Sequence, residues 1–349
     1  MLPVVLSAVS WLRLPAILPQ QVQLYTSEVC LGHDPGADHP ERPQRLLRLL
    51  DDLYGEWMPD YGSLLQVCSP EDADVSDAQL LRVHSRAHLK RANAAFGSWK
   101  LRVGQRSRVD ADTIASSGSR AAARRAAGLV IAAVDSIFGR DDVRDFPQFD
   151  PKPRRAFCMV RPPGHHAEVD TPMGFCWYNN VLVGVAHAQI VYGAQRVAIL
   201  DFDVHHGNGD ADITIGDPRR LYVSSHETPN FPGTGETLGR DGKFKNIVNA
   251  PLPANSGSVE FRLAWRNTLL PAVRSFRPDA IFISAGFDAH SDDPLSSIKL
   301  TDEDYAWLTT KVVNLCGGRL PIVSVLEGGY NVDRLPKSVR RHVHAMIHS

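Results

Sequence analysis

A short polar segment follows an apolar, strand-like run near the middle of the chain. RVAIL is followed by DFDVHHGNGD, which contains Asp201, Asp203, His205 and His206. Alternate side chains of an extended segment face the same side, so Asp201, Asp203 and His205 would point together. Burying so many ionisable groups is costly unless they are paired or bind a metal. The spacing therefore predicts a metal site, and carboxylate and imidazole ligands suit zinc.

A third metal ligand is available elsewhere in the chain. Asp288 follows the apolar run AIFISA, and catalytic zinc sites typically use three protein ligands with one position left open. Asp203, His205 and Asp288 therefore form a candidate set, and His206, left over from it, is expected to be structural. A lone aspartate or histidine would more often cap a helix or satisfy a backbone amide. Five polar segments that each follow an apolar run argue against that simpler explanation.

Two further motifs carry groups suited to acid–base chemistry. His165 and His166 are adjacent and follow a Pro-Pro-Gly turn in RPPGHHAE. Neighbouring imidazoles with different hydrogen-bond partners can hold different protonation states. Asp201 could orient one of them and Asn208 the other. Tyr330 follows two glycines in EGGY, a turn that suits placing a phenol against a bound substrate.

The elements that would position these residues alternate along the chain. Short apolar strands are predicted at 22–26, 156–160, 197–203, 221–226, 280–285 and 322–327. Helices are predicted at 41–54, 118–138, 177–193, 261–276, 302–316 and 336–348. This alternation indicates an α/β fold with a mostly parallel sheet flanked by helices on both faces. Ligands of such sheets bind beyond the carboxyl ends of the strands, where the polar segments fall. We expect one domain over 21–349, preceded by an extension of unknown role over 1–20.

Composition excludes several classes of protein. The 349 residues are 43% hydrophobic and 22% charged with a formal net charge of -1, so the chain is globular and lacks the basic footprint of a nucleic-acid binder. Five scattered cysteines without CxxC spacing argue against a disulfide framework and favour a reducing compartment. No apolar run is long enough to span a membrane. Cytoplasm is the expected location, with an N-terminal targeting segment as the alternative.

Several blocks resemble the zinc-dependent histone deacetylase superfamily, which also includes bacterial acetylpolyamine amidohydrolases and acetoin-utilisation proteins. The blocks are HDPGADHPERPQR, RPPGHHAE, MGFCWYNN, DFDVHHGNG, PGTGE, SAGFDAHSDDPL and EGGY. They run in family order from about Tyr25 to the last helix and are closer to the class II and bacterial branch than to class I. The resemblance implies an arginase-like α/β fold and hydrolysis of an acylated amine.

The resemblance also implies a role for each candidate residue. Zinc would be held by Asp203, His205 and Asp288. His165 and His166 would carry out acid–base work, backed by Asp201 and Asn208 respectively. Tyr330 would donate a hydrogen bond to the substrate carbonyl. The residues expected along the substrate channel are Gly174, Phe175, Phe231, Leu295, Gly328 and Gly329.

Members of the superfamily also bind structural potassium ions. One implied site involves the backbone around Asp201, Asp203 and His205 together with Ser224 and Ser225. A second matches the loop from Thr214 to Arg220. Near this loop Asp210, Asp212 and Thr214 stand where relatives often carry Thr, Gln or Glu, and an aromatic residue, which weakens the expectation of the second ion.

Three functions are open at this stage. The first is hydrolysis of N-acetyl-lysine in proteins to lysine and acetate. The second is deacylation of a small molecule such as an acetylpolyamine or arylalkylamide; Leu295 weakens the polyamine case, because polyamine-selective relatives resemble one another in carrying Glu there. The third is an inactive acetyl-lysine-binding scaffold, against which the complete residue set argues. The expected partner is thus an acetylated substrate, with neither nucleic acid nor membrane; the sequence does not specify an oligomeric state.

Overall fold

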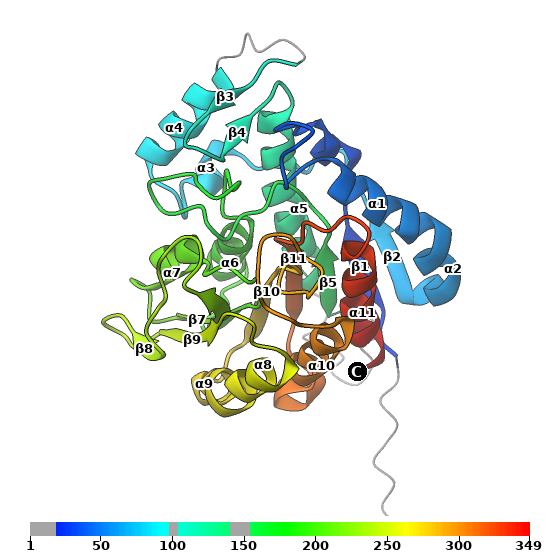
Figure 1. Cartoon of the computed structure of the whole chain (residues 1–349), viewed down its shortest axis with the longest axis vertical. Helices are drawn as coiled ribbons and strands as arrows, with labels where there is room; N and C mark the ends of the chain where they lie inside the picture. The colour runs from blue at the N-terminus through cyan, green and yellow to red at the C-terminus, as the bar shows by residue number, and fades with distance from the viewer. Residues whose placement is uncertain (1–18, 98–103, 140–153) are drawn as a thin grey trace, which may run out of the picture.

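A nine-stranded sheet forms the centre of the molecule in the computed structural model, which describes residues 19–97, 104–139 and 154–349 (Figure 1). Across the sheet the strands are β2 (Leu65–Cys68), β1 (Val22–Tyr25), β5 (Arg155–Cys158), β11 (Ile322–Leu326), β10 (Ala280–Ala285), β6 (Val197–Asp201), β7 (Arg220–Thr228), β9 (Ile247–Pro253) and β8 (Gly239–Asp241). Every neighbouring pair is parallel except β8 with β9. The prediction of a mostly parallel sheet is confirmed.

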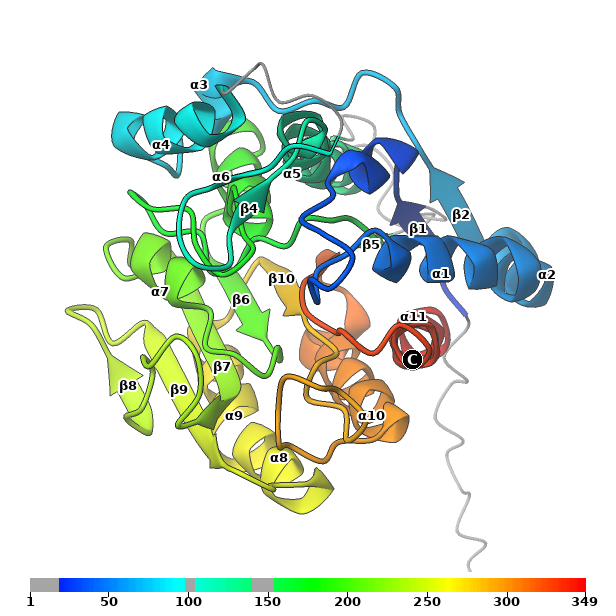
Figure 2. The same ribbon diagram turned by 45° about the horizontal axis from the view of Figure 1, so that its top comes forward.

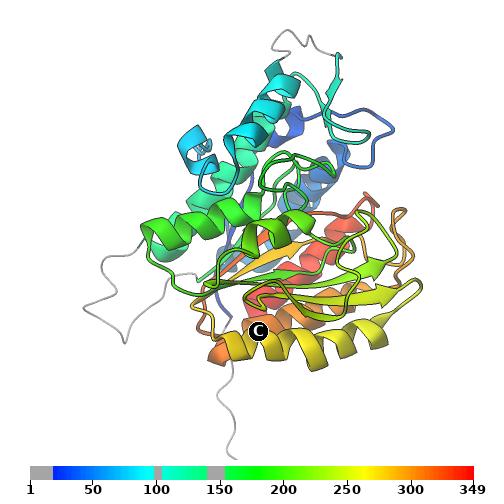
Figure 3. The same cartoon turned by 90° about the vertical axis from the view of Figure 1, so that its left-hand side faces the viewer.

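Helices cover both faces of this sheet. They are α1 (Gln44–Asp52), α2 (Met58–Tyr61), α3 (Asp77–Leu80), α4 (Arg86–Gly97), α5 (Ser119–Phe138), α6 (Asn180–Val191), α7 (Asn208–Thr214), α8 (Ser258–Ala264), α9 (Leu270–Phe276), α10 (Asp302–Val313) and α11 (Leu335–His348). Figure 3 shows α5 and α6 on one side of the sheet and α8, α9 and α10 on the other. Figure 2 shows α1 beside α11, near the end of the sheet that contains β1.

Burial explains why the central strands were readable from sequence. Every residue of β5, β6, β10 and β11 is buried, as continuous apolar runs between two helix layers should be. All six predicted strands are present, β10 with the predicted ends and the others with shifted ends, and five of the six predicted helices are present with shifted ends. The helix predicted at 261–276 is instead α8 and α9, joined by a π-helical turn at Trp265–Leu269.

Some elements were not predicted. Strand β9 has the sequence IVNAPLP, and its two prolines and asparagine do not read as a strand interior. The small antiparallel pair of β3 (Ser107–Arg108) and β4 (Ile114–Ala115) is too short for a periodic signal. Most of the expected extension at 1–20 lies outside the described residues. Within the described part, no helix is long and apolar enough to cross a membrane.

Candidate active site

The polar segments predicted to converge leave five strands that are neighbours in the sheet. In order these strands are β5, β11, β10, β6 and β7, and all of them are parallel. Their carboxyl ends therefore lie along one edge, as the ligand sites of open α/β sheets do. The residues delivered there are His165 and His166 after β5, Tyr330 after β11, Asp288 after β10, Asp203 and His205 after β6, and Phe231 after β7.

Three of these side chains form a compact buried cluster. One ligand atom each from Asp203, His205 and Asp288 lies within 4.8 Å of the others. His205 Nδ1 is 3.1 Å from a carboxylate oxygen of Asp203 and 3.1 Å from one of Asp288. Backbone amides orient both carboxylates: Gly328 N donates to Asp203 at 2.8 Å, and Val204 N donates to Asp288 at 2.9 Å.

The electrostatics of this cluster favour a cation. Burial, reinforced by the Asp203 carboxylate, raises the pKa of Asp288 to about 7. Burial also opposes ionisation of Asp203, but His165 and His205 outweigh it and hold its pKa below the usual range. Two buried carboxylates and an imidazole are costly to bury together unless a positive charge compensates them. Their donor types and spacing fit a zinc ion.

The paired histidines have different partners and opposite electrostatics. Their ring centroids are 4.0 Å apart. Nδ1 of His165 lies 3.2 Å from an Asp201 carboxylate oxygen, whereas Nδ1 of His166 lies 2.7 Å from the amide oxygen of Asn208. Burial lowers the pKa of His165, but Asp203 and Asp201 outweigh it and raise that pKa well above the ordinary value. Burial and the nearby His165 lower the pKa of His166 well below it.

Two residues that support this pair were missed from the sequence. The Tyr222 hydroxyl donates to Asp201 at 2.8 Å, which fixes the carboxylate beneath His165. Glu327 is buried, and its Oε2 accepts from the backbone amides of Gly164 and His165 at 2.6 and 3.0 Å. A signal for Glu327 was present, since a carboxylate ends the mostly apolar strand segment IVSVLE.

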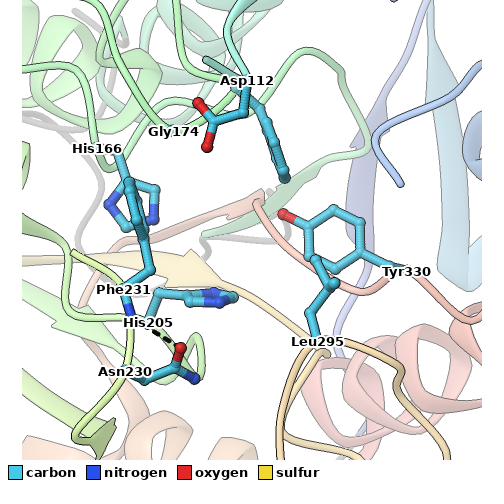
Figure 4. Close-up of a pocket in the computed structure, with 9 residues that line it drawn as sticks. Asp112, His166, Gly174, His205, Asn230, Phe231, Leu295 and Tyr330 are labelled. Carbon is cyan, nitrogen blue, oxygen red and sulfur yellow. Dashed lines mark hydrogen bonds between the residues drawn. The ribbon is translucent and has the colours of Figure 1, made fainter. Parts of the chain in front are cut away.

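A cavity of about 220 Å³ opens above the cluster (Figure 4). It is lined by Asp112, His166, Gly174, Phe175, His205, Asn230, Phe231, Leu295 and Tyr330. Figure 4 shows His166 and His205 on one side, with the Tyr330 hydroxyl facing them across the opening. Of the predicted channel residues, Gly174, Phe175, Phe231 and Leu295 line this cavity. Gly328 and Gly329 are not among its lining residues; a Cβ on Gly328 would collide with the Asp288 carboxylate, beside the candidate metal ligands. Asp112 and Asn230 line it without having been predicted.

Close packing fixes the cavity walls. A Cβ added to Gly174 would come 2.6 Å from the His166 ring, so the chain can pass here only as glycine. Phe175 adopts a φ of 68, a backbone conformation that costs about 1–3 kcal/mol at a non-glycine residue and clusters at functional sites. Its ring meets the Tyr330 ring edge-on at 5.7 Å. Phe231 meets His166 in the same way at 5.0 Å on the opposite side.

Tyr330 is held by two residues that sequence reasoning also missed. Asp293 accepts hydrogen bonds from the backbone amides of Tyr330 at 2.6 Å and Leu295 at 3.0 Å, which ties two walls of the cavity together. The Arg45 guanidinium lies 4.9 Å from the Tyr330 ring centroid and donates to Gly329 O at 2.6 Å. The only sequence signal for this contact is an arginine placed among the leucines of α1, and the structure buries it.

The residues of the first implied potassium site lie on, or directly after, the neighbouring strands β6 and β7. Asp201 is paired with Ser224 across β6 and β7. The Ser224 hydroxyl is 2.9 Å from His226 Nδ1, and the Ser225 hydroxyl accepts from Trp265 Nε1 at 2.9 Å. His206, expected to be structural, has its Nδ1 2.7 Å from the Thr234 hydroxyl and is absent from the residues lining the described cavity.

Comparison with known proteins gives a consistent result. The profile of the histone deacetylase domain matches residues 39–346. "Histone deacetylase 10, chloroplastic" of Oryza sativa subsp. japonica is 35% identical over 90% of this chain and 71% of its own length. "Histone deacetylase-like amidohydrolase" of Pseudomonas aeruginosa is 35% identical over 88% of this chain and 74% of its own length. Among solved structures, the "HDA15 HD domain" superposes with a TM-score of 0.80 at 32% identity, covering 93% of this chain and 90% of that one.

Proposed function

This chain belongs to the histone deacetylase family and is a hydrolase of that family, and we propose that it is a zinc-dependent enzyme that converts N-acetyl-lysine in proteins to lysine and acetate. One observation carries the proposal: His205 of the buried three-ligand cluster, His166 of the histidine pair and Tyr330 all line a single cavity. Asp203, His205 and Asp288 would hold the zinc ion. When bound, zinc supplies Lewis acidity, polarising the amide carbonyl and lowering the pKa of a coordinated water.

His166 is suited to receive a proton from the attacking water. It lines the cavity, and burial with the neighbouring His165 keeps the imidazole neutral by lowering its pKa. Asn208 fixes Nδ1 of His166, which leaves the other ring nitrogen for the substrate. As the C–N bond breaks, a protonated imidazole of the pair would donate a proton to the departing amine.

Tyr330 is suited to stabilise charge on the substrate carbonyl. Burial raises the pKa of its hydroxyl well above the ordinary value, with Asp288 adding to the effect, so the group remains a hydrogen-bond donor. Asp293 and Arg45 hold it in place from behind. Removing one such donor typically reduces kcat by about 10²–10³-fold.

The walls of the cavity suit the aliphatic stem of an acylated lysine. Phe175 and Phe231 are aromatic, Gly174 leaves room between them, and Leu295 adds an apolar side chain. A small acylated amine is the second candidate substrate, because the Asp112 carboxylate at the cavity could pair with a free ammonium group. An acetylpolyamine carries such a group, and an arylalkylamide would use the aromatic walls alone.

A direct comparison of substrates tests these alternatives. Purified zinc-loaded protein would be assayed with an acetyl-lysine peptide and with acetylputrescine, measuring acetate released from each. We expect the higher kcat/KM with the peptide. A clear preference for acetylputrescine would replace this proposal with the small-molecule one, and no turnover of either by zinc-bound protein would refute both.

Two further features belong to the proposal. A potassium ion bound near Asp201 and Ser224 would be structural.

The compartment proposed is the cytoplasm, supported by four described cysteines that are all free thiols. A relative named chloroplastic supports an organelle instead. Fluorescent fusions of the whole chain and of a chain lacking residues 1–20 would distinguish the two locations. Fluorescence in an organelle that is lost when residues 1–20 are deleted would refute the cytoplasmic location.

A further inference from the structure

One asparagine side chain reaches into the loop between α7 and β7. Asn246 precedes β9 and is buried. Its amide nitrogen Nδ2 is 2.9 Å from Thr214 O, 3.1 Å from Asp217 O and 3.1 Å from Arg220 O. Three backbone carbonyls of a single loop therefore converge on one nitrogen atom.

This loop is the one for which the family resemblance implies a second potassium ion. Proteins bind potassium by directing several carbonyl oxygens inward to replace the ion's hydration shell. Here the carbonyls of Thr214, Asp217 and Arg220 have that arrangement, but the Asn246 amide already occupies the point at which they meet. Hydrogen-bond distances to all three oxygens leave no space for an ion at the same point. The residues present therefore do not fit the second ion.

The orientation of the amide follows from the chemistry of its neighbours. A carbonyl oxygen can only accept hydrogen bonds, so the Asn246 oxygen in this position would face three acceptors and be repelled. The nitrogen carries two N–H donors with partial positive charge, so it can bond all three convergent oxygens when one N–H is shared between two of them. The Asn246 backbone is fixed as well, because its carbonyl accepts from Tyr222 N at 2.9 Å in the strand ladder.

We propose that the Asn246 amide takes the place of the second potassium ion, so that the loop from Thr214 to Arg220 is closed by hydrogen bonds and is independent of monovalent cations. The loop begins at Thr214, the last residue of α7. The first residue of the same helix, Asn208, bonds His166. The amide thus secures the far end of the helix that orients the candidate base. This proposal does not depend on the proposed activity, since it concerns a loop outside the described cavity.

Anomalous diffraction with thallium(I) tests the proposal on the unaltered protein. Crystals grown or soaked in a thallium salt would be examined for density within the loop. We expect the Asn246 nitrogen at the centre of the three carbonyls and no thallium there. A thallium peak ligated by Thr214 O, Asp217 O and Arg220 O, with Asn246 turned away, would overturn the proposal.

The substitution Asn246→Asp tests it in solution. A carboxylate among three carbonyl oxygens needs a cation, so the variant should melt several degrees below the wild type in tetramethylammonium chloride and recover in potassium chloride of equal ionic strength. The wild type sets the baseline response from any other potassium site. Asn314→Asp is the matched control, since that exposed amide donates to the single carbonyl of Thr310. A potassium response in Asn246→Asp equal to that of the wild type and the control would contradict the proposal; if the variant does not fold, the thallium experiment decides.

Discussion

The Nδ1 atom of His166 lies 2.7 Å from the side-chain oxygen of Asn208, so this imidazole is paired with a neutral amide. His165, its neighbour in the chain, is paired with the Asp201 carboxylate at 3.2 Å. A carboxylate stabilises the charged imidazole, whereas an amide oxygen orients the ring with far less effect on its charge. Burial thus lowers the pKa of His166 while the acids around His165 raise the pKa of that ring.

Replacing the amide by a carboxylate should therefore change the pH dependence of the reaction. In Asn208→Asp the new charge would stabilise protonated His166 and raise its pKa. Since the neutral ring is proposed to accept a proton, the acidic limb of the kcat/KM profile should move to higher pH. The measurement is a pH–rate profile on an acetyl-lysine peptide. Asp212→Asn serves as the control: it also changes a charge on α7, but Asp212 accepts a hydrogen bond from Val169 N and does not bond His166. An acidic limb that stays in place in Asn208→Asp would argue against His166 as the base.

Local spacing was enough to predict the centre of this site. The D-x-D-x-H pattern and the strand that precedes it determine which side chains point together, and β6 delivers Asp203 and His205 as expected. The adjacent order of the five strands could not be read from the chain, yet it is what brings His166, Asp288 and Tyr330 to one edge.

The supporting residues were beyond the reach of local patterns. Asp293, Arg45 and Glu327 act through backbone amides or carbonyls of segments far away in the sequence. Such contacts depend on the tertiary arrangement and leave no periodic signal. Asn246 was missed for a related reason, because it borders β9, a strand obscured by its prolines.

Removing the metal or its ligands should abolish activity. Chelation should inactivate the enzyme and zinc should restore it, and Asp288→Ala should lose both zinc and turnover because one of three ligands is gone. Zinc per chain, measured by atomic emission, is the readout. His206→Gln is the matched control: this buried histidine is next to a ligand in sequence but bonds Thr234, so its zinc content should remain near one per chain. Full zinc content in Asp288→Ala would contradict the assigned ligand set.

Asp112 should make substrate binding sensitive to pH. Burial, together with the neighbouring Asp110, raises the pKa of this carboxyl to about 6. Above that pH the carboxylate can accept a hydrogen bond from a substrate N–H, and below it this acceptor is lost. We expect KM to rise as pH falls through about 6, by about tenfold at most for a partly exposed charged hydrogen bond.

The matching variants separate this effect from catalysis. Asp112→Asn should show a raised and pH-independent KM, with kcat little changed. Asp110→Asn should move the KM transition to lower pH, since a like charge is removed. If KM in Asp112→Asn follows the same pH curve as in the wild type, a group other than Asp112 causes the pH dependence of KM.

A core histidine far from the cavity should govern part of the acid stability. His342 is buried between the hydroxyls of Thr309 and Ser324, at 2.6 and 2.9 Å, and burial lowers its pKa to about 3. The unfolded chain takes up this proton near the ordinary value of about 6.5, so the unfolded state binds more protons between these two pH values. The free energy of unfolding should therefore decrease as the pH is lowered across this window, by about 1.4 kcal/mol per pH unit for this histidine.

His342→Gln should be less stable at neutral pH but show a shallower decline below pH 6.5. Urea unfolding at several pH values gives both quantities. The same slope in wild type and variant would mean that other buried histidines carry the whole effect.

Acetate release by wild type and Tyr330→Phe, each with its zinc content determined, is the most direct test of the proposed hydrolysis at this cavity. We expect the wild type to form acetate and free lysine in equal amounts from an acetyl-lysine peptide. The variant should keep its zinc and lose about 10²–10³-fold in kcat, because only the hydroxyl that faces the substrate carbonyl is removed. Equal rates in the two proteins, or no acetate from zinc-loaded wild type, would contradict it.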